Sequence, residues 1–171
     1  MKRKLPGLRL KKEFPVRRDW DGSERGFGQS APYDEIGDGT GTSANGCGAP
    51  VLVYLHGGAF LGGSAQEKCF DGSALAAQGM VVVTVNFRLD IFGYAAFPEL
   101  EARDGHAGNY GMYDAYAALE WVQKHIADFG GDPANVTLMG QSAGARMVQL
   151  LCLSPKVKGF VRRAVMCSGG G

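Results

Sequence analysis

The sequence predicts an α/β fold, built on a mostly parallel sheet with flanking helices. Residues 51–55 and 80–85 are short, continuous apolar runs rich in valine, as expected for strands that are buried on both faces. Elsewhere the apolar residues recur every third and fourth position, which is typical of helices. Strands that alternate with helices in this way favour parallel pairing through right-handed crossovers.

The elements are expected in the following order. After the strand at 51–55, residues 70–79 form a helix, residues 80–85 a strand, and residues 88–109 irregular structure. A strand ending at 139, a helix through about 153 and a last strand at 163–167 close the chain. The clearest helix follows the irregular segment 88–109, and a Gly-Gly-Asp-Pro stop at 130–133 ends it. Its apolar residues form one stripe: Met112, Ala115, Tyr116, Leu119, Val122, Ile126 and Phe129.

The chain is long enough, at 171 residues, for one domain with a substantial core. Residues 1–49 read as a basic, irregular N-terminal segment followed by a Gly/Ser-rich linker, and residues 50–171 as the folded unit. Residues 1–18 contain eight Lys or Arg. They could form a surface-binding arm, but a solvated start that packs little is the expected reading.

Composition excludes several classes of function. The net charge is +1, so nothing points to a nucleic-acid partner or to an anionic membrane. The four cysteines show no metal-ligand spacing, and no metal site is predicted; Cys152 and Cys167 lie in apolar runs and are expected to be buried thiols. Without a secretory or membrane-spanning segment, a cytoplasmic location is expected.

The segment from 136 to 153 carries the strongest functional signal. It reads as a buried strand, a tight turn and a helix, and the turn holds Gly140-Gln141-Ser142-Ala143-Gly144, a G-x-S-x-G pentapeptide. In this setting the pentapeptide predicts a nucleophile elbow, in which a strained turn exposes the serine hydroxyl. The two glycines are required because a Cβ would collide with the flanking strand and helix. The Ala143 N–H, at a helix N-terminus, is a natural donor to an oxyanion.

A second set of oxyanion donors is predicted in the loop after the first buried strand. His56-Gly57-Gly58-Ala59 follows residues 51–55 directly, and its glycines allow backbone N–H groups to turn toward a substrate.

Several further segments match the motifs of a known protein family and occur in the same order as in that family. They are 50–60, 83–89 with Phe92-Gly93, 108–111 with Asp114, 118–122, 129–133 and the elbow. Through them the chain resembles the type B carboxylesterases, the family of the cholinesterases and the bacterial p-nitrobenzyl esterases. The similarity covers about residues 50–170, with a weaker match at 20–22 and 27–28.

The resemblance implies an α/β-hydrolase fold and a small-molecule carboxylic ester as substrate, with no metal or organic cofactor. Ser142 would be the nucleophile, and the oxyanion donors would be Gly58, Ala59 and Ala143, with Ala59 standing where the family usually has a third glycine.

Three departures from the family pattern are visible. Gln141 stands where the elbow usually carries glutamate. The family's Ser-Glu-Asp-Cys segment is missing before Pro50, so Arg88 is expected to lack that glutamate as its partner. Third, the triad order of this fold is serine, acid, histidine, and the chain ends 29 residues after Ser142. Residues 50–171 are therefore interpreted as the N-terminal part of an incomplete α/β-hydrolase fold, without the triad acid and histidine.

The residues that could replace the missing triad members have simpler expected roles. His56 is expected to hold the oxyanion loop, His106 lies in an irregular segment, and His125 should face solvent on its helix. Loop, helix-start and turn roles are expected for Asp104, Asp114 and Asp132. The aromatic residues could line an acyl or alcohol pocket or simply pack in the core: Phe60, Phe87, Phe92 and Tyr94.

The functional hypothesis is a serine carboxylesterase that works through an acyl-enzyme. Two alternatives stay open: a catalytically inert fragment, and a non-catalytic binding member of the same family. An exposed edge strand near Met166 is expected to end the sheet. Substrate preference and oligomeric state are not predicted.

Overall fold

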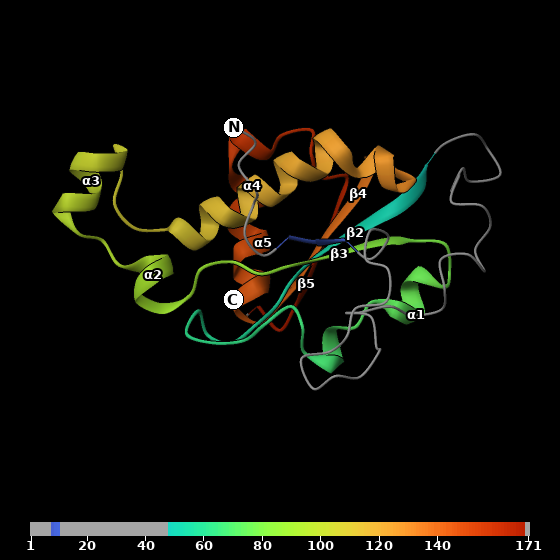
Figure 1. Cartoon of the computed structure of the whole chain (residues 1–171), viewed down its shortest axis with the longest axis horizontal. Helices are drawn as coiled ribbons and strands as arrows, with labels where there is room; N and C mark the ends of the chain where they lie inside the picture. Colours follow the sequence, from blue (N-terminus) through green and yellow to red (C-terminus); the bar gives the residue numbers. More distant parts are fainter. Residues whose placement is uncertain (1–7, 11–47, 170–171) are drawn as a thin grey trace.

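The structure is a computed structural model that describes residues 8–10 and 48–169 (Figure 1). The N-terminal basic segment and the linker therefore lie outside the described residues, apart from 8–10, 48 and 49. The weak family match at 20–28 and Cys47 lie outside as well.

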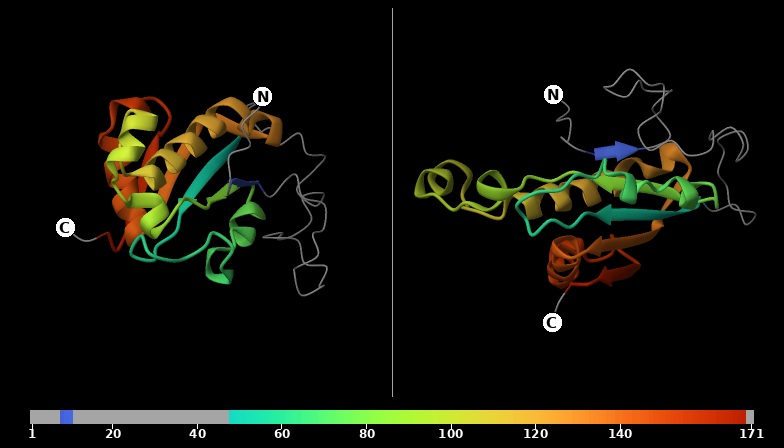
Figure 2. Two further views of the ribbon diagram at one scale, coloured as in Figure 1. Left: turned by 60° about the vertical axis from the view of Figure 1, so that its left-hand side comes forward. Right: turned by 90° about the horizontal axis from the view of Figure 1, so that it is seen from below.

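The described strands form one sheet in the order β1-β3-β2-β4-β5 (Figure 2). β1 is antiparallel to β3, whereas the remaining pairs are parallel, which confirms the predicted mostly parallel sheet. β2 and β4 lie side by side at the centre, and the register pairs Leu55 with Gly140. The strands are β1 (Leu8–Leu10), β2 (Ala49–Leu55), β3 (Val81–Val85), β4 (Gly131–Gln141) and β5 (Arg163–Cys167).

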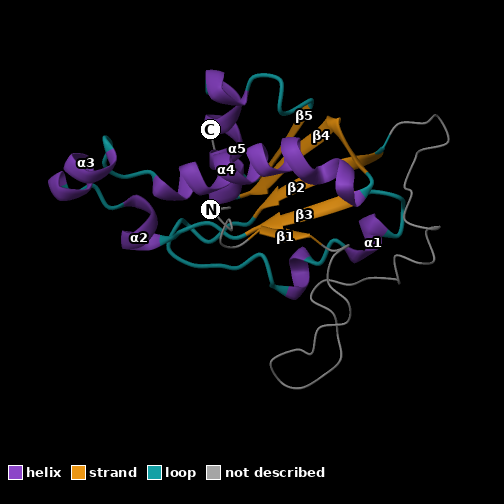
Figure 3. Ribbon diagram, turned by 45° about the horizontal axis from the view of Figure 1, so that its top comes forward, coloured by secondary structure: helices purple, strands orange, loops and turns teal. Residues whose placement is uncertain are grey.

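Helices cover both faces of the sheet unequally (Figure 3). The long helices α4 and α5 pack on one face, the short helix α1 lies on the other, and α2 and α3 extend beyond the sheet (Figure 1). The α-helices are α1 (Ser73–Ala76), α2 (Asp90–Tyr94), α3 (Pro98–Asp104), α4 (Tyr110–His125) and α5 (Ala143–Leu153). Short 3-10 turns are η2 (Lys68–Phe70), η3 (Ile126–Phe129) and η4 (Pro155–Val157).

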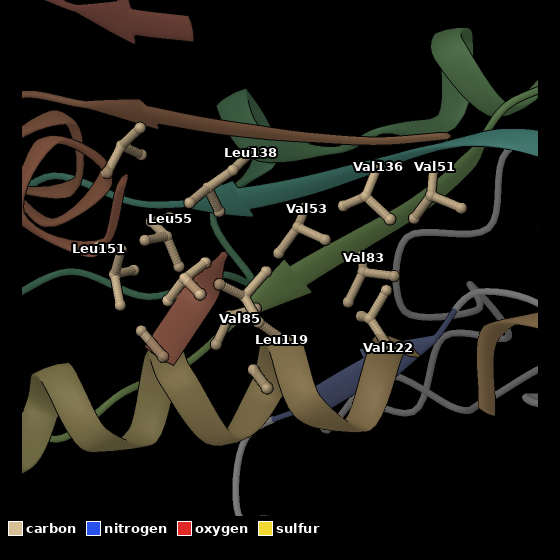
Figure 4. Packing of buried hydrophobic residues seen from close by; sticks show 14 of the residues in the cluster. Val51, Val53, Leu55, Val83, Val85, Leu119, Val122, Val136, Leu138 and Leu151 are labelled. Carbon is tan, nitrogen blue, oxygen red and sulfur yellow. The ribbon is translucent and has the colours of Figure 1, made fainter. Parts of the chain in front are cut away.

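The hydrophobic core lies between the sheet and the helices α4 and α5 (Figure 4). Alternate residues of each strand point to this face, so Val53 joins the main core while Leu52 packs toward α1. Val122 of α4 and Leu138 of β4 are completely buried. The predicted helical stripe therefore serves as the packing surface of α4.

Two predicted elements have different bounds in the structure. The helix expected at 70–79 is reduced to α1, and the segment 88–109, expected to be irregular, contains α2 and α3. Helical signals were present for α3, since Pro98 occupies its first turn and Gly105 ends it with a φ of 77°.

Two strands extend beyond the predicted ones. β4 begins at Gly131 rather than near 136, because its first residue pairs with Ala49. β1 pairs with β3 in a segment expected to be irregular. Both depend on partners far away in the sequence, and local patterns do not specify such pairing.

The prediction of buried cysteines is wrong, since Cys152 is exposed and Cys167 only half-buried. Cys152 lies on the outer side of α5 beside Leu153, which is 75% exposed. Cys167 belongs to β5, which pairs only with β4 among the described strands. Met166 of this strand is 53% exposed, as the expected open edge requires. Within the described ranges, no helix is long and apolar enough to cross a membrane.

The core predicts a clear difference between two Leu→Ala substitutions. Leu138→Ala removes a completely buried side chain and should lower the free energy of unfolding by about 2–5 kcal/mol, because a cavity remains. Leu153→Ala, at a 75% exposed position, should change the free energy by less than about 1 kcal/mol. Urea denaturation of both variants measures the difference, and equal effects would contradict this packing.

Candidate active site

Ser142 lies between β4 and α5 in a strained backbone conformation. Its φ of 52° and ψ of −118° lie outside the regions that a serine normally adopts. Its N–H donates to the carbonyl of Cys167 at 2.8 Å, and its own carbonyl accepts from the Arg146 N–H at 3.1 Å. The first bond ties the turn to β5, and the second starts α5. This is the geometry expected of a nucleophile elbow, and Ser142 itself is half-buried.

Two glycines of the pentapeptide allow this turn to form. A Cβ built on Gly144 would lie 2.1 Å from the carbonyl oxygen of Leu55, at the end of β2. A Cβ on Gly140 would lie 2.3 Å from the carbonyl oxygen of Gly144. Such distances are far below van der Waals contact, so the first turn of α5 can approach the strands only when both positions are glycine.

The loop after β2 packs directly against this turn. A Cβ built on Gly57 would lie only 3.1 Å from the Cβ of Ser142. His56 before it is 1% exposed, its Nδ1 lies 2.7 Å from the Gly57 carbonyl oxygen, and its ring stacks on Phe87 at 4.4 Å. His56 therefore holds the start of the loop, which is the role expected from the sequence.

The loop then turns back through residues that have positive φ. The Leu61 N–H donates to the Gly58 carbonyl at 2.9 Å, and the two residues between them, Ala59 and Phe60, have φ values of 54° and 65°. Two central residues with positive φ are the pattern of a type I′ turn. The Asp90 N–H fixes the turn by donating to the Phe60 carbonyl at 2.7 Å. Gly58 and Ala59 are exposed, and Ser142 is half-buried.

Arg88 has a carboxylate partner that the sequence did not indicate. Asp114 of α4 accepts hydrogen bonds from the Arg88 Nε and Nη2, both at 2.8 Å, and from the Arg88 backbone N–H at 2.9 Å. The side-chain bond to Asp114 raises the pKa of Arg88 above its ordinary value. Asp114 thus joins the end of β3 to the start of α4, which is more than the helix-start role expected for it.

The four aromatic residues have separate roles. Phe87 is buried against His56, whereas Phe60 contacts Tyr94 edge to face at 5.0 Å. Burial is the main cause that raises the pKa of Tyr94 to about 12, so this phenol stays neutral near pH 7. Phe92 is 78% exposed and packs in no core.

None of the three histidines forms a hydrogen bond to the Ser142 hydroxyl within the described part of the chain. His125 is exposed, as expected, and His106 is half-buried and stacks on Tyr113 at 4.4 Å. Asp104 is bound to the Arg103 guanidinium and the Tyr110 hydroxyl, and the bond to Arg103 is the main cause that lowers its pKa to about 2.

Asp132 has the turn role expected from the sequence, since it accepts from the Ala134 N–H at 2.8 Å. Among the described residues, no group of three His, Cys, Asp or Glu side chains could hold a metal ion. The described part of the chain therefore offers neither a metal centre nor an evident general base for Ser142.

Two contributions to the site could not be read from the sequence. The Cys167 carbonyl that fixes Ser142 comes from β5, and only the register of β4 and β5 places it there. Asp114 lies 26 residues after Arg88 in the sequence, and no local pattern indicated that the two side chains would pair.

The sequence profile of the carboxylesterase family matches residues 32–171. The chain belongs to the carboxylesterase family. The resemblance stated from the motifs is thereby confirmed, and the match begins before the first described residue of β2.

Three relatives that the chain resembles are esterases by name. The chain is 47% identical over 125 residues to a fumonisin B1 esterase of Sphingopyxis macrogoltabida, covering 72% of this chain and 23% of that protein. It is 46% identical to the para-nitrobenzyl esterase of Bacillus subtilis (strain 168), covering 70% and 24%. It is 52% identical to human carboxylesterase 5A, covering 70% and 20%.

Solved structures of family members confirm the α/β-hydrolase fold. A thermophilic PNB esterase matches with a TM-score of 0.64 at 44% identity, covering 70% of this chain and 25% of that structure. The chain thus spans only about a quarter of the carboxylesterases it matches.

The elbow packing predicts that Gly144→Ala is strongly destabilising. The new Cβ would meet the Leu55 carbonyl at 2.1 Å, so the variant should lose at least about 2 kcal/mol of the free energy of unfolding. Gly62→Ala is the matched control, because a Cβ there meets no atom within 4 Å. Urea denaturation compares the two, and a Gly144→Ala variant as stable as Gly62→Ala would contradict the packing.

The Arg88 pairing predicts that Asp114→Asn lowers the free energy of unfolding by about 1–3 kcal/mol, since a charge-assisted pair of bonds is lost. Asp128→Asn makes the same change at an exposed position of η3 and should have an effect below about 0.5 kcal/mol. Thermal or urea unfolding of both variants measures this, and a neutral Asp114→Asn would exclude the pairing.

Proposed function

We propose that this chain carries the nucleophile and the oxyanion hole of a serine carboxylesterase that cleaves small-molecule carboxylic esters. The observation that carries the proposal is the strained Ser142 at a strand-to-helix turn, against which Gly57 packs so closely that a Cβ built on it would lie 3.1 Å from the Ser142 Cβ. Membership of the carboxylesterase family and the esterase names of the relatives support the same reaction.

In the first step, the Ser142 hydroxyl attacks the ester carbonyl while its proton passes to a general base. The elbow keeps this oxygen clear of β4 and α5, which permits approach to a bound ester. The carbonyl oxygen becomes negative as the tetrahedral intermediate forms. Expulsion of the alcohol, which takes a proton, then leaves an acyl group on Ser142, and water releases the acid by the same route.

The proposed oxyanion hole consists of the backbone N–H groups of Gly58, Ala59 and Ala143. The first two belong to the turn that Asp90 fixes, and they are exposed and follow Gly57, which packs against Ser142. Ala143 begins α5, where the helix dipole favours negative charge. Donors that are fixed before the reaction can each lower the barrier by about 3–4 kcal/mol, because no reorganisation is needed.

The proposal assigns the general base to none of the three histidines. His56 is buried, and its Nδ1 is engaged by the Gly57 carbonyl. His106 is stacked on Tyr113, and His125 is exposed at the far end of α4. In this account the triad acid and base come from outside these residues, and without a base only a small part of the full rate acceleration would be expected.

Labelling with a fluorophosphonate probe tests the proposed nucleophile. The chain should be phosphonylated slowly at Ser142, because these residues supply no base to activate the hydroxyl, and Ser142→Ala should lose the label completely. Ser154→Ala is the matched control, since Ser154 lies at the opposite end of α5 and should leave labelling unchanged.

The outcomes separate the hypotheses. Strong labelling that depends on Ser142 would exclude the inert fragment and the non-catalytic binding member. No labelling, together with background hydrolysis of 4-nitrophenyl butyrate, would exclude an esterase that works with these residues alone.

A further inference from the structure

The side chain of Gln141 lies over the start of the oxyanion loop. A Cβ built on Gly57 would lie 2.3 Å from the Gln141 side-chain oxygen and 3.1 Å from the Ser142 Cβ. The amide oxygen of Gln141 and the Cβ of Ser142 are therefore at most about 5.4 Å apart, the sum of those two distances. A charge on residue 141 would therefore interact electrostatically with an ester bound at Ser142.

This position is half-buried, and so is Ser142. Charges in such places interact more strongly than charges in water, because the effective dielectric constant falls to about 20. A neutral amide contributes only a dipole. Position 141 therefore adds no repulsion toward an anionic substrate, whereas a carboxylate at the same distance would add a large one.

The other charged residues near this end of the sheet do not supply the negative charge that position 141 lacks. Asp114 is neutralised by Arg88. Glu67 and Asp71 are the carboxylates closest in sequence to the oxyanion loop among the described residues. Both are exposed, as is Asp90, so water and salt screen all three. Arg146, one turn into α5, is an exposed cation on the helix that Ser142 begins.

We infer that Gln141 allows this site to accept esters whose acyl group carries a second, free carboxylate, such as monoesters of dicarboxylic acids, because no negative charge at position 141 repels them. The inference rests on the proposed function and specifies its substrate class. The reaction remains the same: the bond from Ser142 to the acyl carbon forms, the alcohol leaves with a proton, and the distal carboxylate takes no part in the chemistry.

The charge effect can be measured without ester turnover. In a variant with Ser142→Cys and the four native cysteines replaced by serine, the introduced thiol reacts with methanethiosulfonate reagents of either charge. The ratio of the rates with the anionic sulfonatoethyl and the cationic trimethylammonioethyl reagent reports the local potential. The thiol pKa cancels from this ratio, since it affects both rates equally.

In this background Gln141→Glu should lower the ratio of anionic to cationic rates by about tenfold or more, as expected for a unit charge at this distance. Gln78→Glu makes the same change at an exposed position after α1 and should alter the ratio by less than about twofold. If Gln141→Glu does not fold, Gln141→Lys should raise the ratio instead. A ratio that changes no more with Gln141 variants than with Gln78→Glu overturns the inference.

Ester hydrolysis provides a second measurement on the chain with its native Ser142. The ratio of kcat/KM for mono-4-nitrophenyl glutarate to that for 4-nitrophenyl pentanoate should fall about tenfold in Gln141→Glu. A shifted thiol ratio without turnover of either ester supports the charge effect and places the failure in the proposed function. Turnover with an unchanged kcat/KM ratio overturns the inference and leaves the proposed function standing.

Discussion

The close approach of α5 to the ends of β2 and β4 is the contact on which the site depends. Only a glycine at 144 lets the helix backbone reach the Leu55 carbonyl, and only a glycine at 140 lets β4 turn into the helix. Between these two contacts Ser142 is forced to a φ of 52°. Such a conformation costs about 1–3 kcal/mol, which the surrounding packing has to offset. The bond from the Ser142 N–H to the Cys167 carbonyl supplies part of that support.

The same arrangement brings the loop after β2, which we propose forms the oxyanion hole, to Ser142. β2 and β4 are parallel neighbours, and their register places Leu55 beside Gly140. The segments that follow the two strands therefore emerge at the same edge of the sheet, where ligands of parallel sheets bind. The core beneath, from Val53 and Leu138 to α4, fixes this register. Arg88 and Asp114 then hold the end of β3 and the start of α4 in place at the same edge.

Local patterns predicted the parts of the molecule that local chemistry determines. The valine runs, the stripe of α4 and the glycine-flanked Ser142 were all recognisable, because burial and the tight turn restrict the residues at those positions. The same patterns did not predict the extent of β4, the exposure of Cys152 or the partner of Arg88. Each of these depends on which distant segments meet, and Asp114, the partner of Arg88, lies 26 residues away from it in the sequence.

A crystal structure of the phosphonylated chain would test the central claim most directly. The account predicts a phosphorus bonded to the Ser142 oxygen, with the phosphoryl oxygen within hydrogen-bonding distance of the N–H groups of Gly58, Ala59 and Ala143. A phosphoryl oxygen directed to solvent, or an adduct on any other residue, would contradict it.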